Sequence, residues 1–444
     1  MSAVFQRNCH SHMPTAVKGD GAYIIDNHGK RYLDGSGGAA VSSLGHSNAK
    51  VIAAIKGQVD KIAFAHTGFF TSEPAEHLAQ LLVDKAPGAM AKIYFTSGGS
   101  EAVEAALKLA RQYFLERDES HRTLFISREQ SYHGNTLGAL GVSGNVWRKE
   151  PFAPLMQVPN SISPCYAYRG QQAGETENQY GLRVATELEQ KLLELGPQNV
   201  IAFIAEPVVG ATLGAVPSVP GYFVKVREIC DRHGILLILD EVMCGMGRTG
   251  TLFAYEQEHV VPDMVTMAKG LGAGYQPIGA LMVSEEIHNT VANGSGFFQH
   301  GHTYIGHPTA CAAALAVQDV IAEENLLANV VKQGDYLHRQ LQDRFEEHPH
   351  IGDIRGRGLF KGVELVQDRA LKSALPQASM LHLKLKAQMM ENGLICYPGA
   401  GSVDGKQGHH VLIAPAFIVQ PSDLDFLVDT LAKSIDQVLS KIKL

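Results

Sequence analysis

Short apolar runs that end in a polar or charged residue constrain the fold of this chain more than any other feature. They are rich in β-branched and aromatic side chains, and longer segments with helical spacing separate them. This alternation is typical of a mainly parallel β-sheet covered by helices. The expected strands span residues 92–96, 123–127, 200–205, 235–239, 264–268 and 278–283. The expected helices span residues 101–114, 182–195, 223–232, 308–323 and 381–391.

The length of the chain and its weaker strand signals predict two domains. At 444 residues the chain exceeds what one minimal core requires, and its 45% apolar content is enough to bury a large one. Shorter strand signals at residues 22–25 and 411–413 lie toward the two chain ends. We therefore predict an α/β protein with a large, mainly parallel sheet domain and a smaller α+β domain made of both ends. The predicted bounds are residues 61–314 for the large domain, and 1–60 with 315–444 for the small one.

Charge, hydropathy and cysteine usage exclude several classes of protein. The 38 Lys and Arg residues against 45 Asp and Glu residues give a formal net charge of −7 without any block of like charge, so nucleic acid is not an expected partner. The longest aliphatic run, residues 235–239, falls far short of the roughly 20 apolar residues of a membrane span. Residues 1–14 contain no apolar stretch of a secretory signal. The six cysteines form no Cys-x-x-Cys pair, so we expect neither disulfides nor a metal site, and a cytoplasmic location.

Several expected strands lead directly into chemically active residues. Glu206, Asp240 and Lys269 each stand at or just after the end of an apolar run, and residues 97–101 follow another. The carboxyl ends of parallel strands lie along one edge of a sheet, where ligand crevices form. We therefore expect these groups to converge on one site.

Residues 97–101, with the sequence SGGSE, precede a strong helix-forming run. The two glycines let the backbone approach an anion closely, and the free N–H groups at a helix start donate to it with a favourable dipole. This pattern indicates a phosphate cradle. An ordinary serine N-cap explains the same residues and stays open as an alternative.

Asp240 and Lys269 have the chemistry of a cofactor site. Asp240 ends a run that is apolar on both faces, so its carboxylate requires a cationic partner: a protonated pyridine or imidazole ring, an arginine, or the partner in a purely structural ion pair. Lys269 lies between a strand and a glycine-rich segment, where partial desolvation would lower its pKa and leave the amine free to form a Schiff base. A solvated surface lysine is the competing interpretation.

Two further motifs lie near strand ends. Tyr132, followed by His133 and Gly134, offers an aromatic ring that can stack on a flat cofactor, although core packing is the better explanation of this motif taken alone. Residues 245–250 match Gly-x-Gly-x-x-Gly, which raises an NAD-dependent oxidoreductase as a rival. Five residues separate that motif from its strand, and no acidic residue about 20 positions later ends a second strand, so the spacing disfavours a dinucleotide site.

Taken together, these residues resemble the class III family of pyridoxal-phosphate-dependent aminotransferases, the ω-aminotransferase group of fold type I. The resemblance covers nearly the whole chain. Its ordered matches are residues 29–34 (GKRYLD), 44–46 (LGH), 96–102 (TSGGSEA), 132–134 (YHG), 206–208 (EPV), 240–242 (DEV), 247–250 (GRTG), 268–270 (AKG), 302–304 (HTY) and 357–359 (RGL).

The resemblance implies pyridoxal 5'-phosphate as cofactor and assigns its contacts. Lys269 matches the lysine that holds the cofactor as a Schiff base, and Asp240 the partner of the protonated pyridine nitrogen. Gly99 and Ser100 match the phosphate-binding backbone.

The remaining matched positions concern the ring and the subunit boundary. Tyr132 matches the stacking ring, and Val242 the apolar contact on the other face. Thr303 matches a residue that reaches the phosphate of the neighbouring subunit, so the resemblance implies a homodimer with composite active sites.

The chain departs from the family pattern at one place. Many ω-aminotransferases carry a carboxylate-binding arginine shortly before the segment that corresponds to residues 412–415, whereas residues 399–410 contain no arginine here. Lys406, His409 or His410 are candidate substitutes, although lysine cannot reproduce a planar bidentate clamp. Glu206, the partner of that arginine in some members, is retained, and its role is open.

The function that follows is an aminotransferase. We expect it to move an amino group from an ω-amino acid or amine to pyruvate or a similar α-keto acid by a ping-pong mechanism. A pyridoxal-phosphate-dependent decarboxylase or aminomutase on the same fold is the alternative. The identity of the donor and of the group that binds the substrate carboxylate stays open.

Overall fold

A seven-stranded sheet forms the centre of the computed structural model, which describes residues 3–10, 13–157 and 160–442. Its strand order is β4 (Met90–Thr96), β12 (Gly279–Ser284), β11 (Met264–Met267), β10 (Leu236–Asp240), β7 (Val200–Ala205), β5 (Leu124–Arg128) and β6 (Asn160–Ile162). Strand β12 runs antiparallel to both of its neighbours, β4 and β11. All other adjacent strands of this sheet pair in parallel. The predicted mainly parallel sheet is confirmed.

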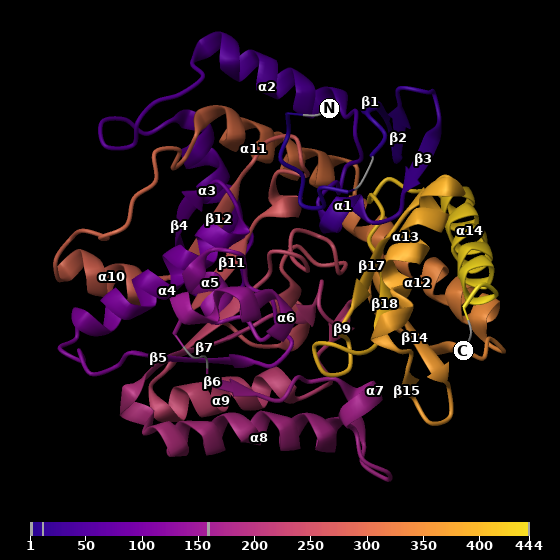
Figure 1. Cartoon of the computed structure of the whole chain (residues 1–444). Coiled ribbons are helices and arrows are strands. Elements are labelled where there is room, and N and C mark those ends of the chain that lie inside the picture. The colour runs from indigo at the N-terminus through magenta and orange to yellow at the C-terminus, as the bar shows by residue number, and fades with distance from the viewer. Residues whose placement is uncertain (1–2, 11–12, 158–159, 443–444) are drawn as a thin grey trace.

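Helices cover both faces of this sheet (Figure 1). Alternate residues of β10 point to opposite faces, so Leu237 and Leu239 join one apolar cluster while Leu236 and Ile238 join another. The first cluster includes residues of α8 (Glu177–Leu195) and α9 (Tyr222–His233). The second includes residues of α4 (Gly99–Leu115) and α10 (Glu285–Asn293). The central strand is therefore shielded from water on both faces.

The two chain ends share a smaller α+β unit, as predicted. Strands β1 (Ala16–Asp20), β2 (Tyr23–Asp26) and β3 (Arg31–Asp34) form a sheet with β16 (Leu394–Ile395), which pairs with β3 in parallel. A second sheet has the order β13 (Ile351–Arg357), β14 (Phe360–Asp368), β18 (His409–Ile413) and β17 (Tyr397–Ala400), with β15 (Ser373–Ala374) on β14. Figure 1 shows α13 (Leu381–Glu391) and α14 (Pro421–Leu439) beside the N-terminal strands.

Helix α11 (Pro308–Glu323) connects the two units. Its residues Ala310 and Ala314 belong to the apolar core of the large sheet, whereas Ala313 and Val317 belong to the core of the smaller unit with α12 (Leu326–Phe345). The helix also packs against α2 (Ala49–Lys61) and α3 (Glu73–Lys85). The predicted boundary between residues 314 and 315 falls within this shared helix, and the domain division stays a prediction.

Local signals explain where the observed elements begin and differ from expectation. Helix α8 begins at Glu177, five residues before the predicted start, because Thr176 and Gln179 form a capping box. Helix α4 begins at Gly99 rather than at residue 101, which brings both cradle residues into its first turn. Strand β6 was not predicted, since three residues carry too little pattern. The remaining short elements are α1 (Gly37–Ala40), α5 (Leu137–Gly141), α6 (Val146–Lys149), α7 (Ala167–Gly170), β8 (Val208–Val209) and β9 (Val216–Pro217).

None of the helices in the described segments combines the length and apolarity that a bilayer crossing needs.

The central strand sets the stability of the large unit. Leu239 is fully buried beside the strand end that carries Asp240, so Leu239→Ala should destabilise the fold by about 2–5 kcal/mol through lost burial and a residual cavity. Leu193→Ala, on a side chain that is 64% exposed, is the matched control and should change stability by less than about 0.5 kcal/mol. Denaturant titration of both variants tests this, and equal midpoints would contradict the packing described.

Candidate active site

Three neighbouring strand ends bring the predicted catalytic residues together. In the parallel pairing, Leu239 of β10 lies opposite Ala205 of β7, so Asp240 and Glu206 follow at the same edge of the sheet. Asp240 in turn pairs with Thr266 of β11, three residues before Lys269. The expected convergence at the carboxyl edge therefore arises from strand register.

Asp240 is a buried carboxylate with three hydrogen-bond donors. One oxygen, Oδ1, accepts the N–H of Val242 at 3.0 Å and the hydroxyl of Thr266 at 3.2 Å. The other, Oδ2, lies 2.7 Å from Nδ1 of His133. Because an ionised carboxylate only accepts, we assign the proton of this contact to Nδ1. These contacts fix the orientation of a negative charge at the end of the central strand.

His133 is a site residue that the sequence reasoning did not single out. It follows Tyr132 in the loop after β5, and its ring is buried with no described hydrogen-bond partner at Nε2. Its backbone N–H donates to the hydroxyl of Ser143 at 2.8 Å. The signal available in the sequence was its place beside Tyr132 at a strand end; its contact with Asp240 spans 107 positions and no local pattern encodes it.

Lys269 begins a short 3₁₀ turn directly after β11 and adopts a left-handed backbone conformation, with φ of 46°. Burial lowers the pKa of its amine to about 8, and the charge of Arg148 acts in the same direction, whereas Asp240 and Glu206 oppose the change. The amine makes no hydrogen bond to any residue in the described segments. A lysine with such a pKa is partly neutral near physiological pH and can act as a nucleophile.

The start of α4 has the shape of an anion cradle. A methyl group on Gly99 would lie 2.7 Å from Cγ1 of Val242, so only glycine fits there. A methyl group on Gly98 would meet nothing within 4 Å, so the backbone stays accessible at that point. The first N–H groups of a helix have no intrahelical partner and are available to an anion. Ser100 does not cap the helix; its hydroxyl accepts the N–H of Asn135 at 3.0 Å and so ties the cradle to the loop after β5.

Tyr132 lies beside Glu206 in the loop after β5. Its N–H donates to Oε2 of Glu206 at 3.3 Å, and the guanidinium of Arg148 lies 4.5 Å from the centre of its ring. Glu206 also accepts the N–H of Gly210 at 3.3 Å. Burial raises the pKa of its carboxyl to about 7, and no arginine or lysine in the described segments forms an ion pair with it.

The candidates from residues 406–410 have different surroundings. Lys406 is exposed, and its backbone N–H donates to Asp404 at 2.8 Å. His409 is buried and stacks on His382 at 5.5 Å, and burial lowers its pKa to about 4. Burial likewise lowers the pKa of His410 to about 3. Both rings are therefore neutral near pH 7, and a role for His409 or Lys406 in binding a carboxylate stays a prediction.

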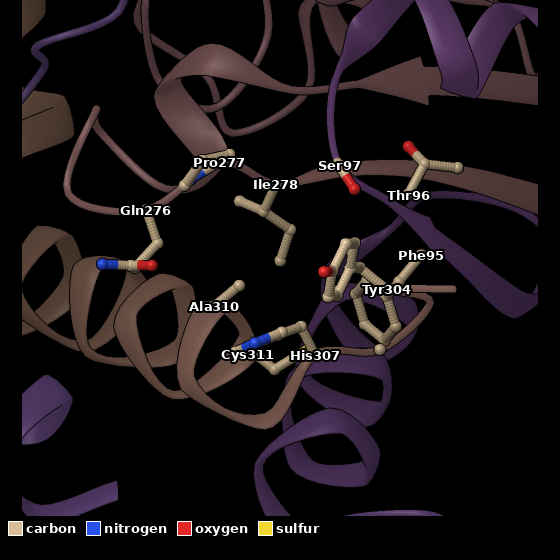
Figure 2. A pocket seen from close by; sticks show the side chains of 11 residues that line it. Phe95, Thr96, Ser97, Gln276, Pro277, Ile278, Tyr304, His307, Ala310 and Cys311 are labelled. Atoms are coloured by element: carbon tan, nitrogen blue, oxygen red, sulfur yellow. The ribbon is translucent and has the colours of Figure 1, made fainter. Parts of the chain in front are cut away.

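Thr303 lies in an exposed turn next to a cavity of about 260 Å³. Figure 2 shows the side chains of Tyr304, Ile278 and Ser97 around this cavity, which adjoins the strand end leading into the cradle. Tyr304 contacts Phe64 edge to face at 5.7 Å. The cavity therefore lies where β4 ends, between that strand end and the start of α11.

Among the described residues, no group of three or more His, Cys, Asp or Glu side chains is placed to hold a metal ion.

The comparisons with known proteins agree with this geometry. The family model for class III aminotransferases matches residues 4–435. An aminotransferase of Schizosaccharomyces pombe is 44% identical over 434 residues, which cover 97% of this chain and 94% of that protein. A taurine–pyruvate aminotransferase of Bilophila wadsworthia is 35% identical, with 96% and 93% covered. The solved structure of an ω-transaminase of Pseudomonas jessenii in complex with PMP superposes with a TM-score of 0.91 at 31% identity, covering 99% of this chain and 97% of that one.

The fold is that of the fold type I pyridoxal-phosphate transaminases. The chain belongs to the class III aminotransferases. It is an enzyme, and enzymes of this class depend on pyridoxal phosphate. The residues present fit that cofactor: an anion cradle that a side chain on Gly99 would disrupt, a fixed carboxylate at Asp240, and an amine of lowered pKa at Lys269.

The pKa of Lys269 gives a direct test that needs no substrate. Amine reagents attack the neutral form, and burial lowers the pKa of this amine to about 8. In cofactor-free protein, competitive acetylation of Lys269 should therefore rise with pH and level off above about pH 9, well below the pKa of about 10.4 of an unperturbed lysine. Peptide mapping provides the readout, with exposed Lys384 as the internal reference. Labelling of Lys269 that keeps rising beyond about pH 10 would contradict its desolvated setting.

Proposed function

We propose that the chain binds pyridoxal 5'-phosphate and moves an amino group from an ω-amino acid or amine to pyruvate or a similar α-keto acid. The observation that carries this proposal is the convergence of three groups at one sheet edge. They are the low-pKa amine of Lys269, the Asp240 carboxylate held by His133, and the glycine-lined start of α4.

Lys269 does the covalent and proton-moving work. The cofactor, when bound, supplies an aldehyde carbon that accepts an amino group and a ring that withdraws electrons from the adjacent bond. The Lys269 amine would hold the cofactor between turnovers and would be released as a free amine while an amino substrate is bound. As a free base, Nζ would take a proton from the substrate carbon and pass it to the adjoining carbon of the cofactor. Its lowered pKa favours the neutral amine that this task needs.

Asp240 and His133 act together as a fixed negative pole. The carboxylate keeps a proton on the pyridine nitrogen, which strengthens the electron withdrawal that the reaction needs. His133 and Thr266 hold the two carboxylate oxygens in place and remove their freedom to rotate.

The cradle and the ring contacts orient the cofactor. Gly99 and Ser100 offer backbone N–H groups to the phosphate at the positive end of α4. Tyr132 would contact one face of the cofactor ring and Val242 the other. Val242 is held in place by its own N–H bond to Asp240 and by close contact with Gly99.

The substrate assignment has two supports. A relative that is 35% identical carries the name taurine–pyruvate aminotransferase, and a structural neighbour is described as an ω-transaminase. In a ping-pong cycle one site serves the donor and the acceptor in turn, so the same groups must tolerate both. Glu206 is buried, and burial raises the pKa of its carboxyl to about 7. It can therefore stay neutral when an amine without a carboxylate occupies the site.

We further propose that the enzyme works as a homodimer with composite active sites. Thr303 would reach the phosphate of the neighbouring subunit, and it stands in an exposed turn beside Tyr304. Phe69, Phe70 and Phe297 are also more than half exposed, at 81%, 67% and 62%. Large exposed aromatic side chains are typical of surfaces that a partner covers.

The proposed location is the cytoplasm. All six cysteines are unpaired, and five of them are buried. A reducing compartment suits a protein with free thiols and no disulfide in its described parts.

Keto-acid-dependent turnover is the test of this function. Purified holoenzyme given an ω-amino acid should release the corresponding carbonyl product only when pyruvate or another α-keto acid is present, with stoichiometric formation of the matching amino acid. Lys269→Ala should lower this rate at least about 100-fold, because the proton-transferring base is gone. A coupled assay for the new amino acid measures both effects.

Lys384→Ala, at an exposed position, is the matched control and should retain the wild-type rate. Turnover that proceeds equally well without any keto acid, with release of carbon dioxide or of a positional isomer, would contradict the proposed transfer reaction. It would instead support a decarboxylase or an aminomutase.

A further inference from the structure

Arg148 is a cation near the active site that lacks an acidic partner. It lies in the short helix α6, with its guanidinium 4.5 Å from the ring centre of Tyr132 and 5.0 Å from that of Trp147. No carboxylate in the described segments lies within ion-pair distance of it, and its Nε is buried without a hydrogen-bond partner. The two ring contacts hold the guanidinium plane without using its N–H donors.

Other arginines of the chain donate at least part of their guanidinium to the protein, although Nε of Arg128 and both Nε and Nη2 of Arg248 also have no described partner. Arg355 forms an ion pair with Glu364 at 2.7 Å and donates to the carbonyl of Gly214 at 2.9 Å. Arg128 donates to the backbone carbonyl of Glu206. Arg148 is half-buried and differs from these arginines, because none of its guanidinium nitrogens has a hydrogen-bond partner among the described residues. Its N–H donors are therefore available to a negatively charged group.

The position of Arg148 places these N–H donors near the reacting centre. Tyr132 contacts the guanidinium through its ring and Glu206 through its backbone N–H. The charge of Arg148 is also close enough to Lys269 to lower the pKa of its amine. An anion that bound to Arg148 would thus lie within the same site as the nucleophile.

We propose that Arg148 binds the carboxylate of the α-keto acid acceptor and of the amino acid formed from it, an inference that rests on the proposed transfer function. A planar guanidinium offers two parallel N–H groups to a carboxylate, which fixes the orientation of the acid as well as its affinity. Arg148 thereby takes the role that residues 399–410, which contain no arginine, cannot fill in the same way.

The alternatives within residues 399–410 are weaker receptors. His409 and His410 are neutral near pH 7 because burial lowers their pKa values to about 4 and about 3. Lys406 is exposed and stands two residues after Asp404. The Asp404 carboxylate accepts the backbone N–H of Lys406 and so places a negative charge close to this lysine. A guanidinium is a cation that offers a planar pair of N–H donors to a carboxylate, which neither a neutral imidazole nor a lysine amine can do. Arg148 is therefore the better receptor for an acid.

The proposal predicts an effect that depends on the substrate carboxylate. Wild-type holoenzyme, Arg148→Gln and Arg148→Lys would first be aminated with 1-phenylethylamine, which carries no carboxylate. Each would then be mixed with pyruvate or with propanal, a three-carbon acceptor without the acid, and the return of the aldehyde-form absorbance followed. Arg148→Gln should raise the half-saturating pyruvate concentration about tenfold or more, through the loss of a charge-assisted bidentate pair. The loss of this charge near Lys269 acts on both acceptors alike, so the readout is the ratio of the two effects: propanal should be affected far less than pyruvate, and Arg148→Lys should fall between wild type and Arg148→Gln for pyruvate.

Arg232→Gln is the matched control, since that arginine pairs with Glu189 and Glu228 on the exposed side of α9 and should affect neither acceptor. Equal loss with pyruvate and propanal in Arg148→Gln would overturn the proposal. Loss of the bound cofactor from that variant would also overturn it, because Arg148 would then serve the cofactor instead of the acid.

Failure of the transfer function itself gives a different result. Wild-type protein would then show no return of absorbance with either acceptor. Titration of the holoenzyme with propionate, an unreactive acid, still decides the role of Arg148 in that case. Weaker binding of propionate to Arg148→Gln than to wild type supports the carboxylate site, and equal binding contradicts it.

Discussion

A single buried negative charge, the carboxylate of Asp240, imposes the strictest constraint on this structure. It ends a strand that apolar side chains cover on both faces, so water cannot solvate it. His133, Thr266 and the N–H of Val242 supply the hydrogen bonds that its two oxygens accept. Each donor comes from a different segment, and together they require the register of β10 with β11 and the path of the loop after β5.

The same arrangement places the other reactive groups. Because β10 pairs in parallel with β7 and β11, Glu206 and Lys269 reach the edge that holds Asp240. Val242, two residues beyond Asp240, packs against Gly99 and thereby links the negative pole to the phosphate cradle. Ser100 links the cradle to the loop of His133 through Asn135. A site built from these contacts keeps its geometry before any substrate arrives, which is the preorganisation that catalysis needs.

Local sequence patterns were sufficient to predict several strands, helices and strand-end residues. They failed for residues whose role depends on contacts between distant parts of the chain. Strand β7 (Val200–Ala205) and helix α11 (Pro308–Glu323) have the predicted bounds because strong apolar periodicity and clear end signals coincide. Asp240 and Lys269 could be proposed from the sequence because a polar group at the end of an apolar run is visible locally, and the structure brings both to one sheet edge. His133 and Arg148 were missed as site residues, since the first depends on a carboxylate 107 positions away and the second on the absence of a nearby acid in the folded chain. Neither property can be predicted from the residues that are adjacent in the sequence.

Reduction of the purified holoenzyme with borohydride, followed by peptide mapping, tests the central role of Lys269 most directly. Reduction makes a Schiff base between a lysine and the cofactor permanent. If the strand-end geometry described above holds the cofactor, a pyridoxyl-phosphate adduct will map to the peptide that contains Lys269. An adduct on another lysine, or none at all in protein that retains its yellow colour, would contradict this assignment.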